Sequence, residues 1–345
     1  MSVIVSRWLN VCCISVFIMI LIGGATRLTQ SGLSMVDWRP LMGVLPPLNH
    51  QQWEDSFNEY KKYPEYQKIN QFKKMNLIKY KSIYYWEYAH RLFGRILGLL
   101  FIIPPLIFFT KGYISRTFFK HCLYCMLLII FQGLLGWFMV KSGLVNIPSV
   151  SHYRLALHLS TALLLLSYTF WLYQVSGKNT WQINNEKIYR FSKILFMALC
   201  IQIIYGAFMS GLKAGFAAPT FPLINDSIIP RLMFNQEPFY SNFLNNKITI
   251  QFIHRALGFL ILAMGIHLGI KLIKEKTQNT SKLGSLIIVI VSTQVILGIV
   301  TLLNFKNGVP ILLASLHQFI AVVLLLTLLF VIIKCKKSDW SLTDN

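Results

Sequence analysis

The sequence has 345 residues, of which 55% are hydrophobic and only 13% are charged, with a formal net charge of +21. A water-soluble domain of this length usually carries about a quarter charged residues, so the composition excludes an ordinary soluble protein. The lysine surplus suits contact with anionic membrane lipid and requires no nucleic-acid partner.

Apolar runs long enough to cross roughly 30 Å of hydrocarbon recur along the chain. They predict eight membrane-spanning helices, over residues 11–28, 88–110, 121–140, 154–175, 194–212, 250–272, 284–303 and 312–333. The first run follows Arg7 as in a signal peptide, but it lacks a small-x-small cleavage site, so we expect it to be retained. The fold class is therefore predicted to be an all-α integral membrane protein.

The distribution of basic residues predicts that both termini lie in the cytoplasm, with the chain in the cell inner membrane. In that orientation the cytoplasmic segments carry fifteen Lys or Arg residues and the last three outer loops carry six. The first outer loop, residues 31–86, carries eight and is the exception. It is long, and long loops follow the positive-inside rule poorly.

The six cysteines lie in or beside predicted helices, so no disulfide framework is expected. Cys122 and Cys125 have the spacing of a redox or metal motif, but no second cysteine pair accompanies them. Burial as small apolar residues is the better interpretation.

The chain contains an internal repeat of four helices. EYAHRLFG around His90 matches QFIHRALG around His254, 164 residues later; QGLLG at 132–136 matches QVILG at 294–298; and His158 matches His317. Because four is an even number, both halves have the same topology and should be related by an axis along the membrane normal. The repeat predicts two pseudo-symmetric four-helix bundles, residues 1–175 with the long loop 31–86, and residues 194–337.

Four histidines occupy matched positions near the outer ends of their helices. His90 and His158 form one expected pair, and His254 and His317 form the other. Two imidazoles at equal depth on neighbouring helices suit a haem iron held between them. The alternative is packing or interfacial histidines, which is how we interpret the remaining four, His50, His121, His152 and His267.

Arg91 and Arg255 directly follow two of these histidines. A guanidinium at the outer interface can pair with a haem propionate, or it can extend to lipid headgroups. The repeated glycines, among them Gly94, Gly98, Gly133, Gly136, Gly258 and Gly298, either let helices approach closely or leave room for a macrocycle, and the sequence does not separate the two.

The two halves differ at Glu87, whose repeat counterpart is Gln251, and at Arg27, which has no counterpart. A carboxylate one turn from a haem ligand can move protons or stabilise a developing cation, whereas glutamine can do neither. The alternative is that Glu87 caps the start of its helix. The aromatic first loop is expected to lie as a lid over this half.

Several segments resemble the haem A synthase family in its alphaproteobacterial and mitochondrial form. They are GATRLTQSGLS at 24–34, DWRP at 37–40, LPP at 45–47, PEY at 64–66 and WEYAHRLFGR at 86–95. The resemblance covers essentially the whole chain. It implies an oxidoreductase that hydroxylates a methyl group of haem O successively to give the formyl group of haem A for cytochrome oxidase. Some relatives carry a cysteine pair in the first outer loop, which this chain lacks.

The resemblance also assigns roles to the predicted residues. His90 and His158 would bind haem O with Glu87 assisting as a catalytic residue, and His254 and His317 would hold haem b as the cofactor. Haem O is then the substrate and the haem O synthase an expected partner, although the sequence leaves direct contact between the enzymes open. It also leaves open whether the chain forms a homo-oligomer.

Two other functions use the same four histidines. A dihaem b-type cytochrome that oxidises quinol would keep two haems permanently and would have no special need for Glu87. A haem transporter would need exchange between the two membrane sides, whereas all four histidines are predicted at one depth.

Overall fold

The computed structural model describes residues 2–36, 45–144, 148–177 and 181–336. Within these ranges there is no β-strand, and eight helices are long and apolar enough to cross a membrane. The prediction of an all-α, multi-pass membrane protein is therefore confirmed. The eight helices are α1 (Val3–Leu28), α3 (Leu77–Thr110), α4 (Arg116–Gly143), α5 (His152–Ser176), α6 (Glu186–Gly211), α8 (Lys247–Lys274), α9 (Gln278–Asn304) and α10 (Ile311–Cys335).

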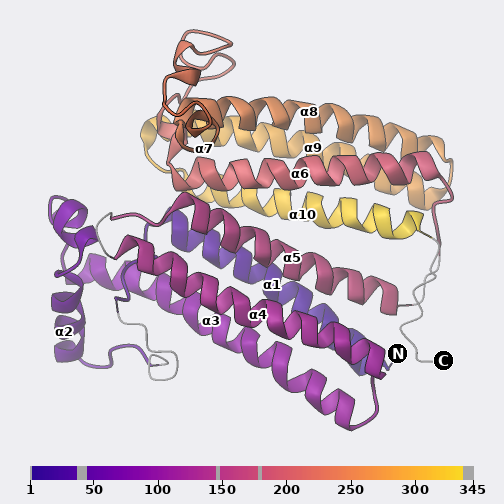
Figure 1. The fold of residues 1–345 in the computed structure, drawn as a ribbon, viewed down its shortest axis with the longest axis horizontal. Helices are drawn as coiled ribbons and strands as arrows, with labels where there is room; N and C mark the ends of the chain where they lie inside the picture. The colour runs from indigo at the N-terminus through magenta and orange to yellow at the C-terminus, as the bar shows by residue number, and fades with distance from the viewer. Residues whose placement is uncertain (1, 37–44, 145–147, 178–180, 337–345) are drawn as a thin grey trace.

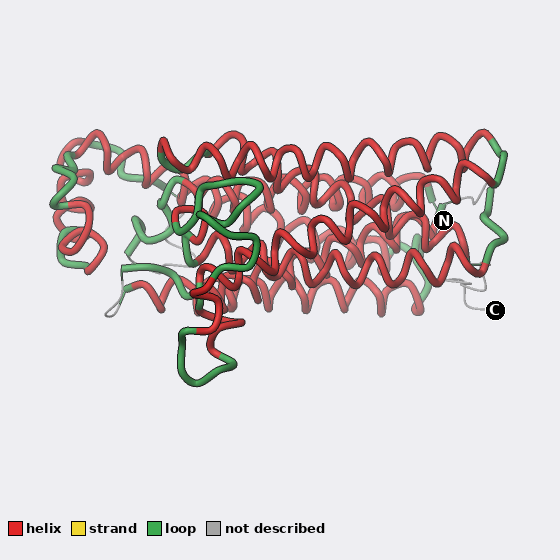
Figure 2. Tube along the Cα trace, turned by 90° about the horizontal axis from the view of Figure 1, so that it is seen from above, coloured by secondary structure: helices red, strands yellow, loops and turns green. Residues whose placement is uncertain are grey.

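Helix α1 begins and helix α10 ends at the same end of the molecule (Figure 1). The short helices α2 (His50–Tyr60) and α7 (Ser241–Asn245) lie at the opposite end, which we call the outer end. A view at a right angle shows the longer loop segments at this outer end and short connections at the other (Figure 2). Lys178, Lys337 and the 37–40 segment, which entered the sequence predictions, lie outside the described residues.

The helices form two groups that lie one above the other in Figure 1. The first group is α1, α3, α4 and α5, and the second group is α6, α8, α9 and α10. Helix α5 packs against α6 and α10, and α1 packs against α10, so these four helices join the groups. The domain boundaries at residues 175 and 194 and the pseudo-symmetry remain predictions.

Polar side chains link the groups across their interface, among them Gln318 and Arg27. Gln318 on α10 donates from Nε2 to the carbonyl oxygen of Ile20 on α1, at 2.8 Å. Arg27 at the end of α1 donates from Nη2 to the carbonyl oxygens of Ser210 and Gly211, at 2.9 and 3.1 Å. These carbonyls end α6, where the helix dipole carries partial negative charge, so the guanidinium is favourably placed.

Helix α3 begins eleven residues earlier than its apolar run predicts, because the apolar run marks only the part inside the membrane. Asn76 caps it by accepting a hydrogen bond from the backbone N–H of Lys79. His90 is therefore the fourteenth residue of α3 and does not open it. The alternative that Glu87 caps this helix is wrong, since Glu87 lies ten residues beyond the first one.

The outer extension of α3 carries a small core of its own. The aromatic rings of α2 pack on it, with Phe57 stacked on Tyr80 at 5.0 Å between centroids. Ser56 and Tyr80 add a hydroxyl–hydroxyl hydrogen bond of 2.8 Å. The buried members are Met35, Trp53, Phe57, Tyr60, Tyr80 and Tyr84. The aromatic segment expected to form the lid also contains Trp86, which is exposed on α3, and Trp38, which lies outside the described residues.

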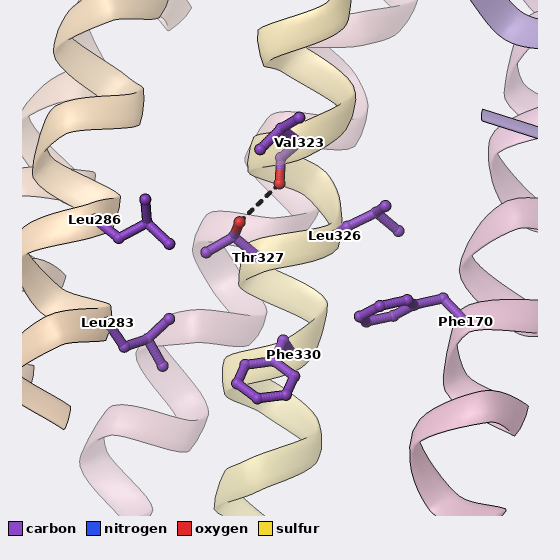
Figure 3. A pocket seen from close by; sticks show the side chains of 7 residues that line it. All are labelled: Phe170, Leu283, Leu286, Val323, Leu326, Thr327 and Phe330. Carbon is purple, nitrogen blue, oxygen red and sulfur yellow. Dashed lines mark hydrogen bonds between the residues drawn. The ribbon is translucent and has the colours of Figure 1, made fainter. Parts of the chain in front are cut away.

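An open pocket of about 270 Å³ is lined by residues of α5, α9 and α10 (Figure 3). Its lining is Phe170, Leu283, Leu286, Val323, Leu326, Thr327 and Phe330. The only polar lining group, the Thr327 hydroxyl, donates to the Val323 carbonyl of its own helix. The pocket thus offers apolar space at the junction of the groups and no reactive group.

Candidate functional site

The structure brings His254 on α8 and His317 on α10 together. Their ring centroids lie 6.4 Å apart and the rings are inclined by 66°. An imidazole nitrogen binds a transition metal at about 2 Å, so rings on opposite sides of one metal have centroids roughly 6 Å apart. The observed separation therefore fits an iron held between the two rings.

The other predicted pair, His90 on α3 and His158 on α5, lies in the first group. A neighbouring glycine marks the place of each ring, Gly23 on α1 for His90 and Gly136 on α4 for His158. All four histidines, these two and His254 and His317, are partly buried. Each helix group thus carries two of the four predicted histidines, and the pairing of His90 with His158 stays a prediction.

A glycine on a neighbouring helix faces each imidazole of the second group. A Cβ added at Gly206 on α6 would lie 3.3 Å from Cε1 of His254, and one at Gly298 on α9 would lie 2.9 Å from Cε1 of His317. Carbon atoms normally approach no closer than about 3.5 Å. Glycine is therefore required for the present ring position at Gly298, and it relieves crowding at Gly206.

The first group repeats this arrangement. A Cβ at Gly23 on α1 would lie 3.2 Å from Nε2 of His90, and one at Gly136 on α4 would lie 3.5 Å from Cε1 of His158. Gly133 differs, because an added Cβ there would meet nothing within 4 Å. Gly136 and Gly298 thus each face an imidazole. Whether the repeated glycines also leave room for a macrocycle stays a prediction.

Three of the four histidines have a buried ring nitrogen without a hydrogen-bond partner. These nitrogens are Nδ1 of His158, His254 and His317. Buried polar atoms are nearly always satisfied, so unpaired ones call for a further ligand or a functional explanation.

The donor set points to a haem more than to a bare metal ion. Among the described residues, no three His, Cys, Asp or Glu side chains gather where they could hold a metal ion. A porphyrin supplies four nitrogens to its iron, so two axial imidazoles complete that coordination. Two-histidine sites in an apolar helix bundle therefore fit haem.

Glutamine amides lie beside the second histidine pair. Gln202 on α6 donates from Nε2 to the carbonyl oxygen of His254 at 2.9 Å, and Gln294 on α9 places its Nε2 3.2 Å from Nε2 of His317. In the first group Gln132 donates to the carbonyl of His158 at 2.9 Å. Gln132 and Gln294 are repeat counterparts, and each contacts the histidine of the following long helix, Gln132 at its carbonyl oxygen and Gln294 at its ring.

Glu87 is buried and fully engaged. Its Oε2 accepts hydrogen bonds from the backbone N–H and the hydroxyl of Ser34, both 2.7 Å, and from the backbone N–H of Met35 at 2.8 Å. Its Oε1 accepts from Arg91 Nη2 at 2.6 Å, in an ion pair whose side chains are 3% and 11% exposed. Arg91 also donates to the Met35 carbonyl at 2.8 Å. The carboxylate thus joins α3 to the first outer loop.

A second buried carboxyl lies in the outer core. Glu65 accepts a hydrogen bond from the Tyr60 hydroxyl at 2.9 Å, and Asn70 donates to that hydroxyl at 2.6 Å. Burial raises the pKa of Glu65 to about 7; the charge of Glu87 also raises it, while the Tyr60 hydrogen bond lowers it. Glu65 belongs to the PEY signature, and its role was not predicted.

Comparison with known proteins places the chain in a family. Residues 6–329 match the family model described as cytochrome oxidase assembly protein. The chain belongs to this family. It is 39% identical to a heme A synthase of Flavobacterium johnsoniae, over 96% of this chain and 97% of that protein. It is 41% identical to a heme A synthase of Wolbachia pipientis, over 93% of this chain and 94% of that protein. It is 39% identical to a heme A synthase of Rickettsia canadensis, over 93% of this chain and 95% of that protein.

Within this member of the family, sequence reasoning missed several residues that shape the histidine sites. Ser34 and Met35 bind Glu87 mainly through backbone N–H groups, which no side-chain pattern reveals. Gln202 and Gln318 do leave a signal. Their repeat counterparts, Ile20 and Leu159, are apolar, so an intramembrane polar residue present in one half alone marks them.

Proposed function

We propose that this chain is a haem A synthase, an oxidoreductase that converts a methyl group of haem O to the formyl group of haem A for cytochrome oxidase. The family match and the curated heme A synthases support this over nearly the whole chain. The structural observation that carries it is the 6.4 Å separation of His254 and His317, with the same glycine-to-imidazole packing in the first group.

The two pairs take different haems in this proposal. The first pair, His90 and His158, binds haem O as substrate, and the second pair, His254 and His317, holds haem b as resident cofactor. Arg91 and Arg255 are proposed to face propionates. For Arg255 this contact would use Nε, which is buried without a partner, because its Nη atoms bind loop carbonyls.

The reaction is a four-electron oxidation in two equal steps. Each hydroxylation replaces a C–H bond of the methyl carbon by C–OH and requires an external two-electron acceptor and an oxygen atom from outside the chain, and the gem-diol then loses water to leave the aldehyde. Bound haem b supplies redox chemistry that amino-acid side chains lack. The protein's own contribution is to orient the substrate through the first histidine pair and to exclude water from it. Glu87 contributes a fixed negative charge one helical turn from His90.

The proposal also covers place and partners. The chain lies in the cell inner membrane with both termini in the cytoplasm, where an apolar haem can enter from the bilayer. The haem O synthase is the proposed source of substrate.

Haem extraction from purified protein tests the function. Haem B together with haem O, a hydroxylated intermediate or haem A is the expected result. Two equivalents of haem B alone would identify an electron-transfer cytochrome instead. A preparation that stays colourless despite an adequate haem supply would exclude both.

A further inference from the structure

We propose that each helix group closes the outer mouth of its haem site with a strap of loop backbone, held by the residues three before and one after the ligand histidine. The straps are residues 31–35 in the first group and 214–223 in the second. The holding residues are Glu87 and Arg91 in the first group and Gln251 and Arg255 in the second. Only the identity of the enclosed haem rests on the proposed function.

The first strap spans from α3 to α4. On α3, Glu87 binds the backbone N–H groups of Ser34 and Met35, and Arg91 binds the Met35 carbonyl. At the α4 side, Leu33 is 3% exposed and lies against Gly143, where an added Cβ would come within 2.7 Å of its methyl groups. The strap therefore runs over the outer end of the first group from α3 to the adjacent α4, on the outer side of His90.

The second strap makes the same crossing between the equivalent helices. Gln251 on α8 donates to the Ala218 carbonyl at 2.9 Å, and Arg255 donates to the carbonyls of Ala218 and Thr220 at 3.1 and 2.7 Å. At the α9 side, Gly215 lies against the Phe305 ring, which a Cβ would approach to 2.8 Å. Helices α8 and α9 are the repeat counterparts of α3 and α4.

The holding residues lie within one helical turn of the histidine on the same helix. Residues three and four apart share a helix face, so Glu87 and Arg91 lie on one face of α3, and His90 is one turn from Glu87. The same spacing applies to Gln251, His254 and Arg255 on α8. A strap bound at these positions covers the site within about one helical turn, or about 5 Å, of the ligand.

The two straps are held with opposite hydrogen-bond polarity. Glu87 accepts from backbone N–H groups, whereas Gln251 donates to a backbone carbonyl. The opposite polarity explains, without any proton transfer, why one half has a glutamate at this position and the other half a glutamine. It also predicts that neither residue can replace the other.

Hydrogen exchange of the full chain in lipid nanodiscs tests the straps, with the two groups as controls for each other. We expect Glu87→Ala to speed amide exchange in peptide 31–36 by roughly tenfold or more and to leave peptide 214–223 unchanged. Gln251→Ala should do the reverse. Ser34→Ala, which removes one of three donors to Oε2, should speed exchange in the first strap by a smaller factor.

The outcomes separate the strap from a general loss of stability and from the proposed function. If either alanine variant changes both peptides equally, or leaves its own peptide unchanged, the strap is refuted. Transfer of haem to apomyoglobin then tests closure: Gln251→Ala should accelerate release of haem B only, and Glu87→Ala release of the other haem only. A protein that holds the wrong haems would refute the proposed function while leaving the exchange pattern intact.

Discussion

Alanine substitution of the glycines that face the imidazoles should alter the iron sites in proportion to the crowding at each position. Gly298→Ala places a carbon 2.9 Å from Cε1 of His317, and Gly206→Ala places one 3.3 Å from Cε1 of His254. Relief to a normal contact of about 3.5 Å needs a shift of roughly 0.6 Å in the first case and roughly 0.2 Å in the second. Overpacking of this kind typically costs about 1–3 kcal/mol.

That shift can be accommodated by turning or displacing the ring of His317, because the added methyl group is attached to the helix backbone. A change in axial-ligand geometry alters the low-spin signal of a haem. Electron paramagnetic resonance of the ferric protein, at equal haem content, should therefore show a large change of the highest g value for Gly298→Ala and a smaller one for Gly206→Ala. Gly136→Ala, with its Cβ at 3.5 Å from His158, should leave the signal as in the wild type.

Two control substitutions make this series decisive. Gly98→Ala on α3 and Gly133→Ala on α4 add a Cβ with nothing within 4 Å, so neither should move the signal. A signal that changes as much in the controls as in Gly298→Ala would show that helix packing in general, and not ring contact, is measured. An unchanged signal in Gly298→Ala with haem retained would refute the reasoning outright.

Three further predictions follow from other buried polar groups. Glu87→Gln should abolish haem A formation while haem b stays bound, because the amide cannot accept all four hydrogen bonds; normal haem A in extracts of this variant would contradict it. Glu65→Gln should remove a pH dependence of protease resistance in the outer core. Because the pKa of Glu65 is raised from 4.5 to about 7 in the folded protein, the wild-type free energy of unfolding should fall by about 3 kcal/mol as pH rises between these values. If protease resistance changes with pH equally in the wild type and in Glu65→Gln, the prediction is wrong. Arg27→Ala should lower the thermal unfolding temperature in detergent through loss of about 2 kcal/mol at the group interface, whereas an unaltered temperature would show that its contacts with α6 contribute nothing.

The membrane architecture was predictable because it follows from one local property. An apolar run of about 20 residues in lipid must be helical to satisfy its backbone, so eight runs predict eight helices. Helix ends outside the bilayer were less predictable. The start of α3 at Leu77 depends on the Asn76 cap and on packing of α2, and neither adds apolar length to the run.

The histidine positions were predictable from the repeat, whereas their surroundings were only partly so. His254 and His317 stand on α8 and α10, which lie opposite each other in the second group and are not packed neighbours as expected, and the structure brings the two rings together. The role of Glu87 in binding loop backbone was not visible, because its partners are mainly N–H groups that every residue carries. Sequence patterns reveal side chains that are unusual for their place, and backbone partners leave no such trace.

The contact between the groups connects the two histidine sites by a short route through the protein. His317 adjoins Gln318, whose amide binds the Ile20 carbonyl of α1 at 2.8 Å. One turn further along α1, Gly23 lies against the ring of His90. A resident redox cofactor is useful to a substrate haem only if electrons can pass between them, and this requires the two sites to be close and fixed in relation to each other. The α1–α10 contact would hold the two proposed sites fixed in relation to each other, because α10, which carries His317, is hydrogen-bonded to α1, whose Gly23 faces His90.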